Sequence, residues 1–225
     1  MINARAVARE SKAERSRRFA LIVRRLDKEM PEAKIALEYQ DELQLLVSVM
    51  LSAQSTDAVV NQVTPALFAR YPTAAHYARS TPEMIGQQIK RVGLWRGKAK
   101  NLHETMTRIA RDHGGHIPRK REELCELPGV GWKTAGVVVN HAFDTPAFPV
   151  DTHVGRVSRR LGLTREEDPR KVESDLSALL PERLWGRAHQ LLIWHGRRTC
   201  EARRPHCSRC AVLDLCPRRG VRESD

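Results

Sequence analysis

The most informative segment of this chain is Leu-Pro-Gly-Val-Gly-Trp-Lys at residues 127–133. Helical patterns flank it, a short one near 119–126 and a second, rich in small residues, over 132–143. Two glycines let the backbone turn sharply and approach another surface closely. The helix after the turn begins with amides that lack partners within the helix, which suits a DNA phosphate. A Gly-x-Gly turn taken alone, however, is more often purely structural.

Lys133 follows this turn directly and falls in the first turn of the second helix. The positive end of the helix dipole disfavours an ammonium there, so we expect the pKa of Lys133 to be lowered. A neutral amine is a nucleophile, which makes Lys133 a candidate catalytic residue. An isolated lysine in this position is otherwise an ordinary solvated side chain.

Asp151 is the candidate partner of Lys133. It lies 18 residues further on, after a connection that contains Pro146 and Pro149. It begins another helical pattern, so the two side chains can face one site. Its simpler role is to cap that helix, because an aspartate there accepts hydrogen bonds from the first backbone amides.

Helical periodicity continues through the rest of the chain. Apolar residues spaced by three and four give residues 19–30 one buried face, and residues 42–52 are apolar enough for a buried helix. Thr56 or Asp57 is typical of a helix cap, and Thr81 and Asp168 each precede a proline, which is typical of a helix start. We find no alternating strand pattern, repeat or low-complexity tract, so we predict an all-α protein.

The composition limits the class of protein. The 225 residues suffice for one large or two modest domains, and 41% of them are hydrophobic, which argues against global disorder. The longest mainly apolar run, residues 43–51, is too short to span a membrane. The N-terminus lacks the apolar core of a secretory signal, so we expect a reducing compartment. Residues 1–25 are arginine-rich like a transit peptide, but Glu10 and Glu14 argue against one.

The charge is strongly positive, with 39 Lys and Arg against 27 Asp and Glu, a net charge of +12. Arginine supplies 30 of the 39, and its planar fork matches phosphate, so nucleic acid is the leading partner. An arginine-rich composition can also follow from a GC-rich genome. The charge is concentrated in residues 90–100, which hold five basic residues and no acid, and in the last 39 residues, which hold nine Arg and four acids.

Four cysteines near the C-terminus form a metal-ligand pattern. Cys200, Cys207, Cys210 and Cys216 have the spacing C-x6-C-x2-C-x5-C in a short, polar segment that cannot fold by burying apolar area. A bound metal would stabilise it, and both zinc and a 4Fe-4S cluster accept four thiolates. Two disulfides are disfavoured by the reducing compartment. Cys125 lies far upstream and is interpreted as a small buried apolar residue.

Together these features resemble the helix-hairpin-helix DNA glycosylases, and among them the branch that carries a 4Fe-4S cluster. The resemblance covers about residues 13–217 and includes the segment at 127–133, Val-Asp-Thr-His at 150–153 and the four-cysteine tail. Two further matches are Leu-Ser-Ala-Gln-Ser-Thr-Asp at 51–57, and Gly-Leu-Trp at 93–95 followed by Lys-Ala at 98–99.

The resemblance implies a two-domain all-α fold with the active site in the cleft between the domains. One domain is a six-helix barrel over residues 35–145 with the helix-hairpin-helix at about 119–143; the other joins residues 1–34 to residues 146–225. The four cysteines are then ligands of a 4Fe-4S cluster with a mainly structural role. Arg203 and Arg204, in the loop between the first two cysteines, are expected to face the DNA backbone.

The resemblance also implies a mechanism, a substrate and a location. The damaged nucleotide is flipped out of the duplex, Lys133 attacks its sugar, and β-elimination cuts the strand, with Asp151 assisting. Gln54 and Leu94 resemble side chains that enter the gap, although Leu94 alone reads more simply as a core residue. Gly129, Val130 and Gly131 are expected to bind DNA. We expect a bacterial, cytoplasmic monomer acting on double-stranded DNA that contains oxidised pyrimidines or abasic sites.

Departures from the family pattern concern the substrate. Cys125 stands where some relatives have a glutamate, Trp132 adds an aromatic before the lysine, and Trp95 and Arg96 alter the intercalating loop.

Two other functions remain open. An adenine-specific mismatch glycosylase typically lacks the lysine, and a non-catalytic DNA-binding protein with a zinc site needs only the hairpin and the basic surface.

Overall fold

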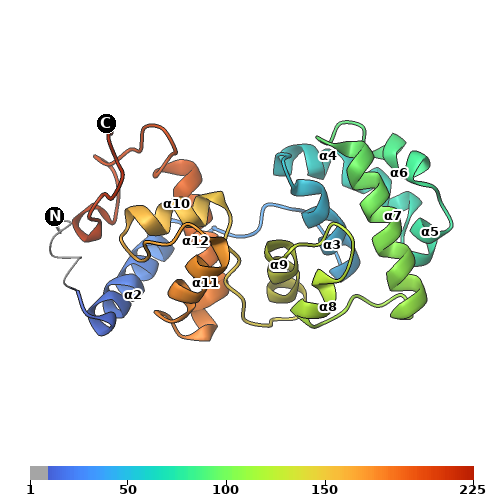
Figure 1. Cartoon of the computed structure of the whole chain (residues 1–225). Coiled ribbons are helices and arrows are strands. Elements are labelled where there is room, and N and C mark those ends of the chain that lie inside the picture. Colours follow the sequence, from blue (N-terminus) through green and yellow to red (C-terminus); the bar gives the residue numbers. More distant parts are fainter. Residues whose placement is uncertain (1–9) are drawn as a thin grey trace. The chain divides into compact units, whose positions relative to one another are not determined.

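The computed structural model describes residues 10–225, and within them every regular element is a helix, which confirms the all-α prediction (Figure 1). None of these helices is long and apolar enough to cross a membrane. The α-helices are α2 (Lys12–Glu29), α3 (Glu42–Ser52), α4 (Asp57–Arg70), α5 (Ala74–Ala78), α6 (Pro82–Gln88), α7 (Trp95–Asp112), α8 (Arg121–Cys125), α9 (Trp132–Ala142), α10 (Thr152–Arg160), α11 (Pro169–Ser177) and α12 (Trp185–Arg198). The 3-10 helices are η1 (Glu182–Leu184) and η2 (Leu213–Leu215).

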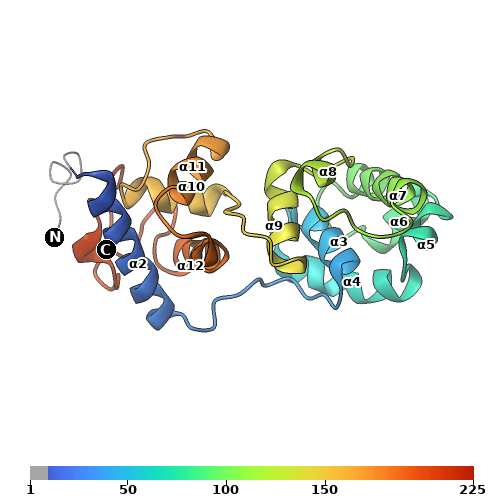
Figure 2. The ribbon, with the colours of Figure 1, turned by 90° about the horizontal axis from the view of Figure 1, so that it is seen from below.

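The chain divides into two compact units. The continuous unit spans Ala36–Thr145 and contains α3 to α9. The discontinuous unit combines the chain up to Ile35 with Pro146–Asp225, so α2 belongs with α10 to α12. The chain passes between the units twice, after α2 and after α9 (Figure 2). Residues 1–9, part of the stretch compared above with a transit peptide, lie outside the described residues.

The continuous unit is built around α3. All seven residues from Leu45 to Leu51 are buried, so this helix is covered on every side, as its apolar sequence predicts. It packs against α9, α4 and α7. Caps fix where the neighbouring helices begin: Thr56 accepts a hydrogen bond from the Val59 amide, and Thr81 accepts one from the Met84 amide.

The discontinuous unit has its own apolar core. Helix α2 contributes the predicted face of Phe19, Ile22, Val23 and Leu26, all buried among residues of α10, α11 and α12. Ser11 and Glu14 form a reciprocal capping box that fixes the first turn of α2. An N-terminal helix is thus folded into the C-terminal half of the chain.

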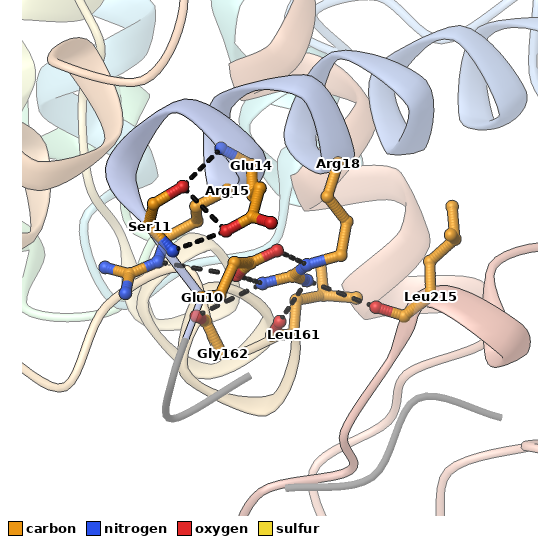
Figure 3. A network of polar contacts seen from close by, with 8 residues as sticks. All are labelled: Glu10, Ser11, Glu14, Arg15, Arg18, Leu161, Gly162 and Leu215. Atoms are coloured by element: carbon orange, nitrogen blue, oxygen red, sulfur yellow. Dashed lines mark hydrogen bonds and ion pairs between the residues drawn. The ribbon is translucent and has the colours of Figure 1, made fainter. Parts of the chain in front are cut away.

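Arg18 ties α2 to two distant segments (Figure 3). Its guanidinium donates to the carbonyls of Leu161 at 2.7 Å and Leu215 at 3.1 Å. It also forms a two-pronged ion pair with the Glu10 carboxylate, with both contacts at 2.8 Å. Because Arg18 is only 5% exposed, these acceptors replace water around a buried charge.

We predict that Arg18→Leu lowers the free energy of unfolding by about 2–4 kcal/mol, because it leaves Glu10 and two carbonyls without their buried donor. Chemical denaturation followed by circular dichroism measures the loss. Arg17→Leu is the matched control, since Arg17 is the adjacent arginine and is exposed. Equal stability of the two variants would contradict the role given to Arg18.

Candidate functional site

The turn at residues 127–131 is a tight hairpin between α8 and α9. Val130 donates its amide to the carbonyl of Leu127 at 3.1 Å. Gly129 has a φ of +74°, and a Cβ there would lie 2.7 Å from the Asn101 side-chain nitrogen. Only glycine combines that backbone conformation with so close an approach to α7. Gly131 has extended backbone and caps α9 without a side chain.

Side chains of helix α7 hold the hairpin by donating hydrogen bonds to its backbone carbonyls. The Thr105 hydroxyl, in a fully buried residue, donates to the carbonyl of Pro128 at 2.6 Å. One turn further along α7, Arg108 donates to the carbonyl of Glu126 at 3.2 Å. The amides of the hairpin and of the first turn of α9 therefore belong to a rigid frame that can bind an anion.

Lys133 is the second residue of α9 and is half-buried. Trp132, directly before it, is held by Arg121 of α8, whose guanidinium lies 3.9 Å from the centre of the indole ring. Arg121 also donates through Nε and Nη2 to the carbonyl of Trp132 at 3.1 and 3.0 Å. Gly136 leaves room for this guanidinium, because a Cβ there would lie 2.5 Å from Nη2.

Arg121 is a residue that sequence reasoning missed. A lone arginine before the turn carries no signal by itself, and the pairing of Arg121 with Gly136 is visible only in three dimensions. The interpretation of Cys125 also needs correction. It ends α8 with a partly exposed side chain and is not a buried core residue.

A second pair of loops in the continuous unit carries Gln54 and Leu94. Both residues have left-handed backbone, with φ of +54° and +56°. Leu94 is 65% exposed, so its simpler interpretation as a core residue is wrong. The loops meet at Gly93, where a Cβ would lie 2.9 Å from the carbonyl oxygen of Gln54. The structure therefore presents an apolar side chain to solvent beside a strained polar residue.

Lys98 of α7 holds these two loops together. Its ammonium donates to the carbonyl of Leu51 at 2.7 Å and to the hydroxyl of Ser55 at 3.0 Å. The same hydroxyl accepts the amide of Gly93 at 3.1 Å. Burial lowers the pKa of Lys98. Within the basic run at 90–100, Lys98 thus has a structural role that its charge did not predict, whereas Lys90, Arg91, Arg96 and Lys100 are exposed.

Asp151 caps α10 in the discontinuous unit, as its simpler interpretation predicts. Its Oδ1 accepts the amide of Val154 at 2.8 Å. The side chain of Asp151 is half-buried, and His153 lies two residues further on, in the first turn of α10. Burial lowers the pKa of His153, against the opposing effect of the Asp151 charge. The cap fixes the orientation of the carboxylate at the start of the helix.

The four cysteines of the tail line one pocket, together with Arg160 and His195. Arg160 donates to the Cys200 sulfur at 3.4 Å, and the Cys210 sulfur lies 3.8 Å from Nε2 of His195. Burial raises the pKa of Cys210 and of Cys216 to about 11, so thiolates at these positions require a cationic partner.

The four cysteine sulfurs could hold either a zinc ion or a 4Fe-4S cluster, which differ in how the thiolates are arranged. Across residues 10–225, no three His, Cys, Asp or Glu side chains converge closely enough to hold one metal ion. Zinc needs all four sulfurs at about 2.3 Å from a single ion. In a 4Fe-4S cluster the thiolates bind different irons, so they surround a larger group. Four thiols that line one pocket are a donor set that both zinc and a 4Fe-4S cluster accept.

The loop between the first two cysteines is shaped by Arg160, which donates to the carbonyls of Glu201 at 2.6 Å and Ala202 at 2.7 Å. Arg203 and Arg204 follow and are exposed. They are therefore accessible to a polyanion, while Arg160 fixes the backbone that carries them.

We predict that Gly129→Ala lowers the free energy of unfolding by about 1–3 kcal/mol, because the new Cβ meets the Asn101 side chain in left-handed backbone. Gly131→Ala is the control: nothing lies within 4 Å of its Cβ, and it loses at most about 1 kcal/mol as a poorer helix cap. Urea denaturation compares the two. A Gly129→Ala protein as stable as the Gly131→Ala protein would mean that the hairpin does not need its contact with α7.

Comparisons with known proteins agree with this arrangement. Residues 47–182 match the HhH-GPD superfamily of base excision DNA repair proteins. Endonuclease III of Synechocystis sp. is 45% identical over 92% of this chain and 94% of that protein, and endonuclease III of Bacillus subtilis is 46% identical over 83% and 85%. A solved structure of a trapped endonuclease III–DNA covalent intermediate, an estranged-adenine complex, has a TM-score of 0.86 and 40% identity, covering 89% of this chain and 95% of that one. The chain therefore belongs to the HhH-GPD superfamily of base excision DNA repair proteins and, within it, to the endonuclease III family.

Proposed function

We propose that this protein removes oxidised pyrimidines from double-stranded DNA and then cuts the strand at the resulting abasic site. The observation that carries the proposal is Lys133, which stands at the second position of α9 directly behind a rigid hairpin. The protein is 40% identical to an endonuclease III whose solved structure is a trapped covalent intermediate with DNA. A lysine amine is a nucleophile of the kind that such an intermediate requires.

DNA binding is assigned to three features. The amides at Gly129, Val130 and Gly131 bind a backbone phosphate of the duplex. Arg203 and Arg204 bind the backbone through their exposed guanidinium groups. Gln54 and Leu94 occupy the space that the flipped nucleotide leaves, which explains why an apolar side chain is 65% exposed in strained backbone.

The chemistry begins with the flipped nucleotide. The neutral amine of Lys133 attacks C1′ of the sugar, the C–N bond forms, and the glycosidic bond breaks as the base leaves with its electron pair and takes up a proton. Opening of the sugar ring gives a Schiff base. Loss of a proton from C2′ then breaks the C3′–O bond, so the strand is cut on the 3′ side, and water releases Lys133.

Asp151 supplies the proton acceptor for this sequence. Its carboxylate takes a proton from the attacking amine and stabilises the positive charge that develops on the sugar. Its capping bond to the Val154 amide holds the carboxylate in one orientation. One residue therefore serves both as helix cap and as base.

Cys200, Cys207, Cys210 and Cys216 are proposed to hold a 4Fe-4S cluster, supported by the pocket they line and by the likeness to endonuclease III. When bound, the cluster supplies folding stability to a segment with little apolar surface. Arg160 and His195 line the same pocket: Arg160 donates to the Cys200 sulfur, and burial lowers the pKa of His195 to about 4, which keeps that imidazole neutral.

The two other functions each meet a contrary observation. An adenine-removing mismatch glycosylase typically lacks the lysine, whereas Lys133 is present at the start of α9. A non-catalytic zinc protein does not account for the likeness to an endonuclease III trapped as a covalent intermediate with DNA. The protein is proposed to act as a monomer on the bacterial chromosome in the cytoplasm, with the two units of the fold as its barrel and cluster domains.

Asp151→Asn tests the reaction without disturbing the fold, because asparagine caps a helix as well as aspartate does. We predict that the single-turnover rate of base excision from a thymine glycol duplex falls by about 100-fold or more, since the general base is lost. DNA affinity stays the same or rises, because a negative charge is removed. Gel assays of excision and fluorescence anisotropy of the bound duplex measure the two quantities.

Asp168→Asn is the matched control, since Asp168 caps α11 in the same unit by accepting the amides of Arg170 and Lys171. It should excise at the wild-type rate. An Asp151→Asn enzyme with unchanged turnover would remove Asp151 from the mechanism.

Iron content tests the cluster assignment. We predict about four irons per chain in anaerobically purified protein, with a yellow-brown colour. Cys207→Ser should lose most of the iron and lower the melting temperature, because the cluster stabilises the tail. Cys125→Ser, outside the tail, should keep the wild-type iron content. A colourless wild-type protein loaded with zinc would contradict the assignment.

A further inference from the structure

A second pocket in the discontinuous unit is lined almost entirely by arginine. It lies at the C-terminal end of α10 and has a volume of about 420 Å³. Its lining comes from α10, from the loop that follows α10, and from the C-terminal tail, where the Arg219 amide donates to the Arg160 carbonyl at 3.1 Å. The lining residues are Arg156, Arg159, Arg160, Thr164, Arg165, Arg219 and Gly220.

Two of these arginines have structural roles, because their guanidinium groups donate hydrogen bonds to backbone carbonyls. Arg156 donates to the carbonyls of Gly196 at 2.8 Å and Cys200 at 3.2 Å, and Arg160 donates to the loop carbonyls described above. Arg159, in the last turn of α10, is favourably placed at the negative end of the helix dipole and makes one long contact, 3.5 Å, to the carbonyl of Glu166. Arg165 and Arg219 come from other segments, so the helix dipole does not account for them.

The pocket brings these cations together without a carboxylate in its lining. Two acids close to the lining residues have other partners. Asp175 accepts the hydroxyl of Thr164 at 2.5 Å, and the Glu166 carboxylate lies 3.9 Å from the ammonium of Lys171. Five guanidinium groups therefore share one pocket whose lining holds no carboxylate, and Glu10, whose charge raises the pKa of Arg219, is itself paired with Arg18. Like charges held this close destabilise the folded protein unless an anion binds among them.

Arg219 shows the effect of this crowding. It is partly buried, and burial, followed by the charge of Arg165, lowers its pKa. Arg165 is exposed and lines the same pocket. A guanidinium is planar and presents paired donors, so two of them on opposite sides of a pocket match the oxygens of a phosphate.

The lining also limits the ligand. It contains no aromatic side chain and no carboxylate, so the groups it offers are mainly guanidinium donors, which match the oxygens of a phosphate. We propose that this arginine pocket is a binding site for a phosphate group, with Arg159, Arg165 and Arg219 as its main ligands. The phosphate comes either from a free phosphate or pyrophosphate ion or from the backbone of DNA, since both present the same oxygens.

Isothermal titration with pyrophosphate tests the site in the full-length protein. We expect saturable binding that weakens at least tenfold in Arg165→Gln/Arg219→Gln, because two guanidinium ligands are lost. The fold should persist, since neither side chain donates a hydrogen bond to another described residue. Arg24→Gln/Arg183→Gln is the matched control. Both arginines are exposed and lie in the same unit as the pocket, and the two substitutions remove the same amount of charge. Circular dichroism and melting temperature confirm that each variant is folded.

Binding of an undamaged duplex at several salt concentrations distinguishes the two sources. If the phosphate belongs to DNA, the slope of log affinity against log salt falls by about 1–2 in the pocket variant and stays unchanged in the control. If the source is a free ion, only pyrophosphate binding is lost. The proposal is overturned if the pocket variant matches the control in both measurements. No lesion is involved, so the result is independent of the glycosylase assignment.

Discussion

The close packing of the hairpin on α7 is the constraint on which the candidate site depends. Gly129 approaches Asn101 so closely that a methyl group does not fit, and the buried Thr105 hydroxyl holds the carbonyl of Pro128. These contacts fix the direction in which α9 leaves the turn, and so they fix Lys133. The same helix carries Lys98 near its other end, which joins the loops of Gln54 and Leu94. One helix therefore positions the hairpin, the lysine and the loops that carry Gln54 and Leu94.

The discontinuous unit depends on a different device, in which buried guanidinium groups bind backbone carbonyls. Arg18 joins α2 to the end of α10 and to the tail, and Arg160 shapes the loop that carries Arg203 and Arg204. The half-buried Arg187 of α12 also donates to the carbonyls of Met30 and Pro31, which follow α2. Part of the net charge of +12 is thus structural. The excess that remains exposed is the part available to a polyanion.

Local signals predicted the helices well and the tertiary contacts poorly. Caps such as Thr56, Thr81 and Asp168 act within one turn, so the sequence reveals them directly. The exposure of Leu94 was not predictable from its own apolar character, because a left-handed loop turns it outward. The roles of Lys98 and Arg121 also escaped, since their partners lie in other segments of the chain. Lys133 and Asp151 were identified because the pattern around each matches a family whose chemistry is known.

The central claim is that Lys133 forms a covalent bond to the sugar, and borohydride trapping tests it most directly. Borohydride reduces a Schiff base to a stable amine, so a lyase becomes permanently attached to a duplex that contains thymine glycol or an abasic site. We expect wild type to give a single cross-linked band on a denaturing gel and Lys133→Ala to give none, while both proteins bind the duplex. Trapping of Lys133→Ala as efficient as that of wild type, or no trapping of wild type, would contradict the account.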